Sequence, residues 1–164
     1  AKSSGLGTSP SVVVLHVASV QPKAWDVVCL TMISAIANNG IAVSPYLVSE
    51  IKNPEGEVAF FEKTETLGDF FSPSVAQSLD NLLRSNVKNQ YGDSYFKGMD
   101  MCGKTGTAEV SDSEDAKPNA LFVGYSQNEE TPFAIIVVVE NTTSAIQSAV
   151  PVATAVMKEI NKQY

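Results

Sequence analysis

The chain has 164 residues, 44% of them hydrophobic, and a formal net charge of −7. This length corresponds to one domain or a large part of one, and the acidic balance argues against a nucleic-acid partner. One histidine and two cysteines do not make a usual zinc site, so we expect no metal and no other cofactor. The longest apolar stretch, residues 27–37, falls short of the roughly 20 residues that a bilayer requires. No signal-peptide pattern opens the sequence.

The N-terminal part of the sequence predicts a lead-in, a strand and a buried helix. Residues 1–10 are rich in Ser and Gly, whereas residues 11–17 are β-branched and apolar. Apolar side chains are nearly continuous over residues 25–38, and the Asn-Asn-Gly that ends this stretch is a typical helix stop. We therefore divide the chain into a lead-in, residues 1–24, whose structure the sequence does not define, and a folded part, residues 25–164.

A hairpin and an amphipathic helix are expected next. Residues 46–51 and 57–61 flank a tight Asn-Pro-Glu-Gly turn, which predicts a small hairpin. A serine followed by Pro73 is a typical helix start, because it supplies an N-cap and a proline at the first helical position. Apolar residues at helical spacing then predict a helix over residues 73–88. Residues 89–100 read as a polar loop that contains glycine.

The downstream half predicts an antiparallel sheet closed by a helix. Strand-like segments occur at residues 101–108, 119–126 and 132–140, and the last of these is almost wholly apolar, as a central strand would be. An acidic loop, residues 111–115, separates the first two. A proline-initiated helix over residues 149–162 should pack on the sheet. The predicted fold class is α+β, an antiparallel sheet flanked by helices.

The strand around Lys104 is the candidate functional site. Thr105 and Thr107 lie two residues apart, so their hydroxyl groups project from one face of a strand. Gly106 lies between them, and glycine in a strand often marks a close approach of a ligand or of another backbone. Two hydroxyl groups and an ammonium group on such a strand suit a carboxylate. The alternative is an edge strand with a solvated lysine.

Four short motifs occur in one order along the chain. They are AIANNG at residues 35–40, PYLV at 45–48, KTGTAE at 104–109 and FVGY at 122–125. This series resembles the C-terminal half of the transpeptidase domain of penicillin-binding proteins, most closely the class B, monofunctional enzymes. The resemblance runs from about Trp25 to the end of the chain. It implies an antiparallel sheet flanked by helices that is incomplete on its N-terminal side, with the Lys-Thr-Gly strand beside the active site.

The resemblance assigns roles to the residues of the candidate strand. The family uses three elements, Ser-x-x-Lys, Ser-x-Asn and Lys-Thr-Gly, to attack the carbonyl group of D-Ala-D-Ala stem peptides and of β-lactams. It implies that Lys104 and Thr107 are catalytic, Lys104 through its positive charge and Thr107 through an amide that completes the oxyanion hole. It also implies that Thr105, Gly106 and Thr107 bind the substrate. Gly106 would leave room for the acyl group.

No Ser-Lys pair in the sequence suits the nucleophile. Ser49 and Lys52 match the pattern but fall on a predicted strand, where positions i and i+3 face opposite ways. Ser85 and Lys88 fall at the end of a predicted helix, where the helix dipole is negative and disfavours a developing oxyanion. Ser126 begins a Ser-x-Asn only in the turn of the last hairpin. We expect the serine nucleophile to lie outside this chain.

Three interpretations remain open at this point. The chain is part of a peptidoglycan D,D-transpeptidase, or a non-catalytic binding or structural module of that fold, or a relative of the β-lactamases and β-lactam sensors. The intact KTGTAE motif favours the first. Its partners would be stem peptides, β-lactams and the missing N-terminal half, with self-association through an exposed sheet edge. The parent protein would be extracytoplasmic and anchored to the membrane by a segment absent from this chain.

Overall fold

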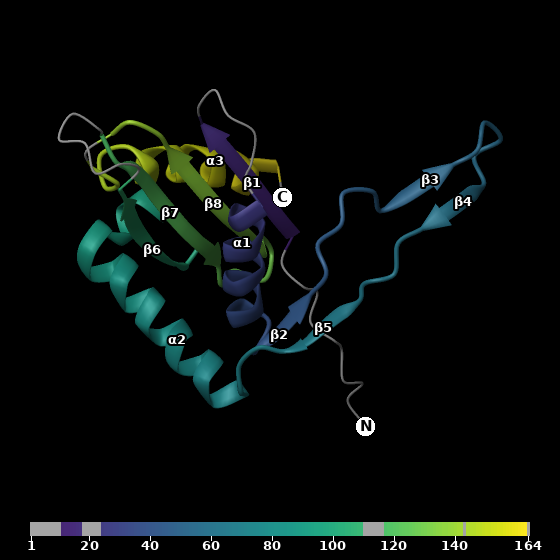
Figure 1. The fold of residues 1–164 in the computed structure, drawn as a ribbon, viewed down its shortest axis with the longest axis horizontal. Helices are drawn as coiled ribbons and strands as arrows, with labels where there is room; N and C mark the ends of the chain where they lie inside the picture. Colours follow the sequence, from purple (N-terminus) through teal and green to yellow (C-terminus); the bar gives the residue numbers. More distant parts are fainter. Residues whose placement is uncertain (1–10, 18–23, 110–116, 143, 164) are drawn as a thin grey trace.

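The structure is a computed structural model, and it describes residues 11–17, 24–109, 117–142 and 144–163. Residues 1–10 and 18–23 of the predicted lead-in, and the acidic loop at 111–115, lie outside the described residues. The molecule has a body, in which helices cover both faces of a sheet, and a long hairpin arm that projects from it (Figure 1). The predicted α+β fold class is confirmed.

The sheet of the body has four strands in the order β1-β8-β7-β6. The strands are β1 (Ser11–Val17), β6 (Met101–Ala108), β7 (Asn119–Ser126) and β8 (Phe133–Val139). β6, β7 and β8 are antiparallel neighbours, as predicted, and their bounds agree with the expected ones to within a residue. β1 pairs with β8 in parallel, from Ser11 opposite Phe133 to Val17 opposite Val139. β1 therefore covers the outer edge of β8 and is itself the edge strand on that side of the sheet.

Three helices complete the body, α1 (Ala24–Ala37), α2 (Pro73–Asn86) and α3 (Ala149–Gln163). All three were predicted at nearly these bounds. α1 packs on one face of the sheet through Leu30 and Ile33, and α3 packs on the other through Val150 and Met157. Figure 1 shows α1 and α3 on either side of the sheet, with α2 running along β6. None of the described helices is long and apolar enough to span a membrane.

The connection between α2 and β6 is more structured than the predicted polar loop. α2 begins as expected, with Ser72 accepting a hydrogen bond from the Val75 amide at 3.4 Å. It ends at Asn86, where a π-helical turn, η1 (Val87–Tyr91), and a 3₁₀ turn, η2 (Asp93–Phe96), follow. These turns place the aromatic side chains of Tyr91 and Phe96 in the core that packs against β6 and β7. Their burial removes apolar surface from water and so stabilises the fold.

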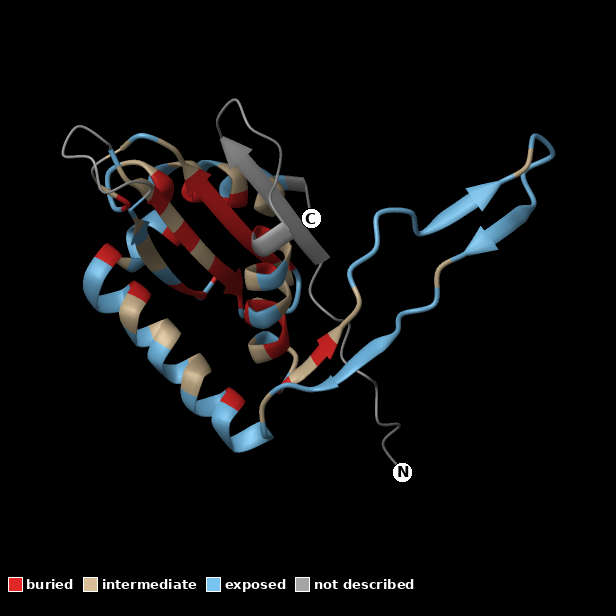
Figure 2. Cartoon of the chain, in the orientation of Figure 1, coloured by how far each residue is buried: buried red, intermediate tan, exposed pale blue. Residues whose placement is uncertain are grey.

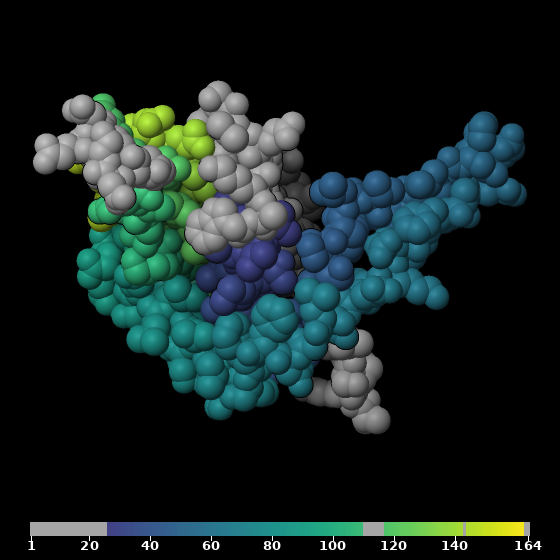
Figure 3. Space-filling view, in the orientation of Figure 1, coloured from purple at the N-terminus to yellow at the C-terminus, as the bar shows by residue number. Residues whose placement is uncertain are grey.

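The hairpin arm comprises residues 41–69. At its base β2 (Ile41–Val43) pairs with β5 (Thr66–Asp69), and farther out β3 (Glu50–Lys52) pairs with β4 (Val58–Phe61), all antiparallel. The outer pair is the predicted hairpin, with a first strand shorter than expected; the inner pair was not predicted. Figure 2 shows the arm as almost wholly exposed, and Figure 3 shows it standing clear of the body. Large apolar side chains are exposed along the arm, which is unusual for the solvent-exposed surface of a monomeric protein.

Candidate active site

The candidate strand β6 passes from the core to the surface at its middle. Met101 and Cys102 are buried, on opposite faces of the sheet, whereas Lys104 and Thr107 are exposed. Side chains alternate along a strand, so Thr105 and Thr107 share the face of Met101, and Lys104 shares the face of Cys102. The sequence placed the two threonines on one face, and the structure agrees.

Lys104 reaches the outer edge of β6 although its side chain starts on the other face from the threonines. Its Nζ donates a hydrogen bond to the carbonyl oxygen of Thr105 at 2.6 Å. The ammonium group and the backbone of Thr105 therefore meet at the strand edge. A hollow of about 220 Å³ lies near the start of β6, beside Arg84, Phe96 and Asp100.

Two of the three glycines around the site are required by packing, and the third is not. Gly103 lies opposite Gly124 in the β6–β7 ladder. A Cβ added to Gly124 would lie 2.4 Å from the carbonyl oxygen of Cys102, and one added to Gly103 would lie 2.7 Å from Cζ of Phe122. A Cβ at Gly106 would meet only the Leu121 Cβ, at an ordinary 3.7 Å. Packing within this chain therefore does not require a glycine at 106.

Side chains of α2 pair with the outer edge of β6. Arg84 donates to the carbonyl oxygen of Met101 at 3.2 Å, and Asn86 donates to that of Gly103 at 2.7 Å. In an antiparallel strand alternate residues turn their N–H and C=O groups away from the neighbouring strand, and these two carbonyl groups belong to that outward row. The start of the edge is thus covered.

Tyr91 of η1 continues this pairing along the edge. Its hydroxyl oxygen accepts a hydrogen bond from the Thr105 amide at 2.9 Å and lies 2.9 Å from Thr105 Oγ1. Asn86 Nδ2 also donates to this hydroxyl group, at 2.9 Å. Thr107 is the next residue of the outward row. Sequence reasoning missed both Tyr91 and Asn86, because an isolated tyrosine in a polar loop and an asparagine at a helix end carry no recognisable pattern.

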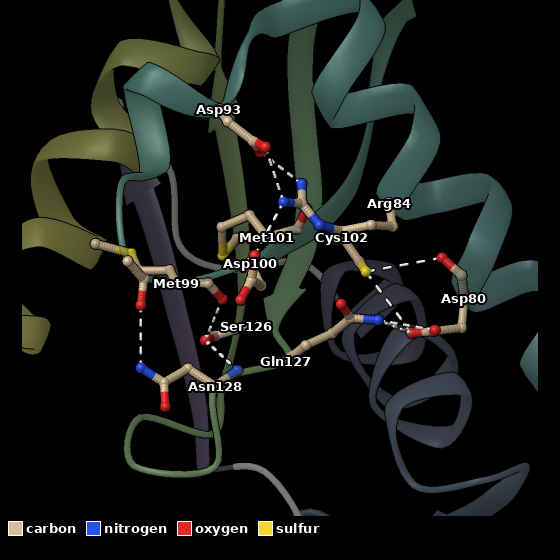
Figure 4. A network of polar contacts seen from close by, with 11 residues as sticks. Asp80, Arg84, Asp93, Met99, Asp100, Met101, Cys102, Ser126, Gln127 and Asn128 are labelled. Carbon is tan, nitrogen blue, oxygen red and sulfur yellow. Dashed lines mark hydrogen bonds and ion pairs between the residues drawn. The ribbon is translucent and has the colours of Figure 1, made fainter.

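An ion-pair network fixes α2 and η2 against the beginning of β6 (Figure 4). Arg84 donates to both carboxylate oxygens of Asp93, at 2.6 and 2.9 Å, and to Asp100 at 3.0 Å. Its side chain is only 13% exposed. The hydrogen bonds from Arg84 lower the pKa of Asp93, and those to Asp93 in turn raise the pKa of Arg84. A bidentate pair of this kind is geometrically specific, so it holds the helix that supplies Asn86.

A second polar cluster beneath α2 excludes a cysteine nucleophile on this strand. Asp80 accepts hydrogen bonds from the Tyr125 hydroxyl at 2.5 Å and from Gln127 Nε2 at 2.8 Å. The Cys102 thiol lies beside the same carboxylate, with its sulfur 3.7 Å from Asp80 Oδ1 (Figure 4). Burial, with the nearby Asp80 charge, raises the pKa of Cys102 to about 12. The thiol therefore stays protonated at neutral pH and is a poor nucleophile.

The residues that match the Ser-x-x-Lys and Ser-x-Asn patterns make contacts that stabilise the fold. Ser85 lies in the last turn of α2 and accepts a hydrogen bond from Asn89 at 2.9 Å. Lys52 pairs with Glu50 at 2.9 Å on β3. Ser126 ends β7, where its hydroxyl group donates to the Met99 carbonyl oxygen at 2.7 Å. Across the described parts of the chain, no hydrogen bond joins a serine to a lysine side chain.

Comparisons with known proteins identify relatives over most of the chain. Residues 27–162 match the family model of the penicillin binding protein transpeptidase domain. The chain is 30% identical over 109 residues to the peptidoglycan D,D-transpeptidase PbpA of Mycolicibacterium smegmatis, covering 66% of this chain and 22% of that protein. Its identity to the protein of the same name from Mycobacterium tuberculosis is 27%, covering 94% of this chain and 33% of that protein.

A solved structure shares the fold. Penicillin-binding protein A from M. tuberculosis, in its ceftriaxone acyl-enzyme complex, matches this chain with a TM-score of 0.71 at 27% identity. The match covers 79% of this chain and 30% of that one. The chain thus spans about a third or less of the length of the relatives that it matches.

Proposed function

The chain belongs to the penicillin-binding protein transpeptidase family, and we propose that it supplies the Lys-Thr-Gly strand of a peptidoglycan D,D-transpeptidase. The substrates would be D-Ala-D-Ala stem peptides, with β-lactams as their analogues. The observation that carries this proposal is the outer edge of β6, where the Lys104 ammonium group meets the Thr105 backbone, beside a glycine whose place would also accommodate a Cβ. The serine nucleophile would come from the half of the domain that precedes these residues.

Each residue of the strand has a chemical task in this proposal. Lys104 adds positive charge beside the reacting carbonyl group and takes part in proton transfer. The hydroxyl groups of Thr105 and Thr107 bind the substrate carboxylate. The Thr107 amide, in the outward row of the strand, donates to the oxyanion together with the amide of the nucleophile. Gly106 offers backbone without a side chain, so the acyl group can lie against the strand.

The partner that completes the domain would cover the exposed apolar face of α1, α2 and the hairpin arm. Val28 and Met32 of α1 are 56% and 44% exposed, and Leu82 of α2 is 66% exposed. On the arm, Leu47 and Phe61 are 104% and 67% exposed. Large exposed apolar side chains of this kind favour an interface with another protein. The Lys104 side chain starts on the same side of the sheet as α1, so a half docked there would place its serine near β6.

The parent protein would act outside the cytoplasm. Peptidoglycan is assembled on the outer side of the membrane, so a domain that cross-links it has to be exported. We propose an extracytoplasmic location at the cell surface or in the periplasm, with a membrane anchor in a part of the parent protein other than this chain.

Labelling with a fluorescent penicillin tests the proposed function. The isolated chain is expected to remain unlabelled, because a serine hydroxyl without a base in hydrogen-bond reach is a weak nucleophile. Adding the upstream half as a separate polypeptide should restore labelling, on a serine of that half. The measurement is in-gel fluorescence followed by peptide mapping. An adduct on Ser85 or on any other serine of the isolated chain would contradict this account.

The isolated chain is also expected to self-associate through the exposed apolar side chains of α1, α2 and the hairpin arm, which the other half of the domain would otherwise cover. Sedimentation velocity at tens of micromolar should show dimers or larger species, since exposed apolar side chains drive association. The double change Leu47→Ser and Phe61→Ser should shift the chain toward monomer. Ile146→Ser removes an apolar side chain of 46% exposure from the turn before α3, outside α1, α2 and the arm, and serves as the control. A chain that stays monomeric at every concentration tested by sedimentation would contradict this proposal.

A further inference from the structure

We propose that Tyr91 is a positioning residue that turns the hydroxyl proton of Thr105 outward, toward the carboxylate of a bound substrate. The inference rests on the proposed function, because it deepens the role of Thr105 at the edge of β6. Tyr91 itself would not touch the substrate. It acts through Thr105, and Asn86 acts through Tyr91.

The hydroxyl oxygen of Tyr91 is held by two donors. The Thr105 amide donates to it at 2.9 Å, and Asn86 Nδ2 donates to it at 2.9 Å. The orientation of the Asn86 amide is fixed independently, because the same nitrogen donates at 2.7 Å to the carbonyl oxygen of Gly103, which can only accept. Both lone pairs of the phenol oxygen are therefore occupied by N–H groups.

The proton of Tyr91 then has one direction left to it. The remaining neighbour of the phenol among the described contacts is Thr105 Oγ1, at 2.9 Å, and a hydroxyl oxygen can accept. Tyr91 is therefore the donor in this pair and Thr105 is the acceptor. The proton of the Thr105 hydroxyl group cannot point back at Tyr91, so it is available to an incoming acceptor. A carboxylate, which only accepts hydrogen bonds, matches this polarity.

The tyrosine ring is anchored, so the arrangement is preorganised. Tyr91 is 7% exposed, and its ring meets that of Phe122 edge to face, with centroids 6.1 Å apart. The contact also restricts how a substrate strand pairs with β6. The Thr105 amide is already engaged by Tyr91, so backbone pairing with the substrate falls to Thr107, the next outward-facing residue. The edge thus offers a hydroxyl donor at 105 and an amide donor at 107.

A titration of the isolated chain tests the proposal by ¹⁵N-resolved NMR. The probes are N-acetyl-D-alanyl-D-alanine and the same dipeptide with a C-terminal amide. The wild-type chain is expected to bind the acid in preference to the amide, with shifts at Thr105 and Thr107. Tyr91→Phe keeps the ring but removes the hydroxyl group, and it should lower this preference by about tenfold, the worth of one hydrogen bond to a charged group.

Matched variants separate orientation from general damage. Tyr95→Phe removes a hydroxyl group from a 40% exposed tyrosine of η2 and should leave the preference unchanged. In a Thr105→Val background Tyr91→Phe should have no further effect, because its route to the ligand is gone. Thr105→Ser should retain the preference and its dependence on Tyr91. An acid preference that survives Tyr91→Phe, or falls equally in the Thr105→Val background, would overturn the proposal.

A measurement on the unaltered chain guards against a variant that fails to fold. The buried Tyr91 hydroxyl proton should give a nuclear Overhauser effect to the Thr105 side chain, and a Thr105 hydroxyl proton directed at Tyr91 would contradict the inference. A wild-type chain that does not distinguish acid from amide would also overturn it. The labelling experiment decides the proposed function separately, because reconstituted labelling requires the nucleophile and this titration does not.

Discussion

Replacing Lys104 with alanine is expected to reduce penicillin labelling of the reconstituted domain by about 100-fold or more, which is typical of the loss of a preorganised group that stabilises negative charge in the transition state. The ammonium group lies at the edge of β6, bonded to the Thr105 carbonyl oxygen at 2.6 Å. In the assembled domain it would face developing negative charge in a site from which water is excluded. The second-order rate of labelling, measured at several penicillin concentrations, gives the effect directly.

The control removes the same charge elsewhere. Lys158 lies exposed on α3, away from β6, and Lys158→Ala should label at the wild-type rate. Thr105→Val should lower the rate less than Lys104→Ala does, since it removes one neutral donor. All three variants must have the melting temperature of the wild type for the comparison to hold. A Lys104→Ala domain that labels as fast as Lys158→Ala would show that Lys104 is only a solvated surface lysine.

Local sequence patterns were sufficient to predict the elements of the body. The serine N-cap and Pro73 fix the start of α2, and the apolar run before Glu140 becomes the buried strand β8. The hairpin β3–β4 follows from its turn. Each of these signals resides in a few neighbouring residues and depends little on the rest of the chain. The family resemblance, carried by four short motifs, is confirmed by the match over residues 27–162.

Features that depend on distant contacts could not be predicted. The parallel pairing of β1 with β8 joins segments more than a hundred residues apart, and no local pattern specifies which strand it pairs with. β2 and β5 are short and pair only across the whole arm. Tyr91 became part of the site because a π-helical turn after α2 directs it inward onto Thr105. From the sequence alone it was one aromatic residue in a polar loop.

Packing requires a glycine at positions 103 and 124 of β6 and β7, but not at position 106. Gly103 and Gly124 face each other, and the ring of Phe122 lies against them. The same ring packs on Tyr91 and stacks on Phe96 with centroids 5.5 Å apart. The glycine pair therefore positions the aromatic cluster that supports Tyr91 and, through it, Thr105. Gly106, two residues before the end of the strand, has no such neighbour.

Gly124→Ala is accordingly expected to destabilise the chain by about 3 kcal/mol, which is near the upper end of overpacking costs, because its Cβ would lie 2.4 Å from a backbone oxygen that cannot move away. For a chain of this size the melting temperature should fall by roughly 6–12 °C.

Gly106→Ala, whose Cβ has only an ordinary contact at 3.7 Å, should stay within about 0.5 kcal/mol of the wild type in its free energy of unfolding. In the reconstituted domain Gly106→Ala should nevertheless lose most of its penicillin labelling, because the new methyl group occupies the place proposed for the acyl group. Urea denaturation and labelling rates, measured on both variants, check the pair. Equal stabilities for the two variants, or full labelling of Gly106→Ala, would refute the division of roles between these glycines.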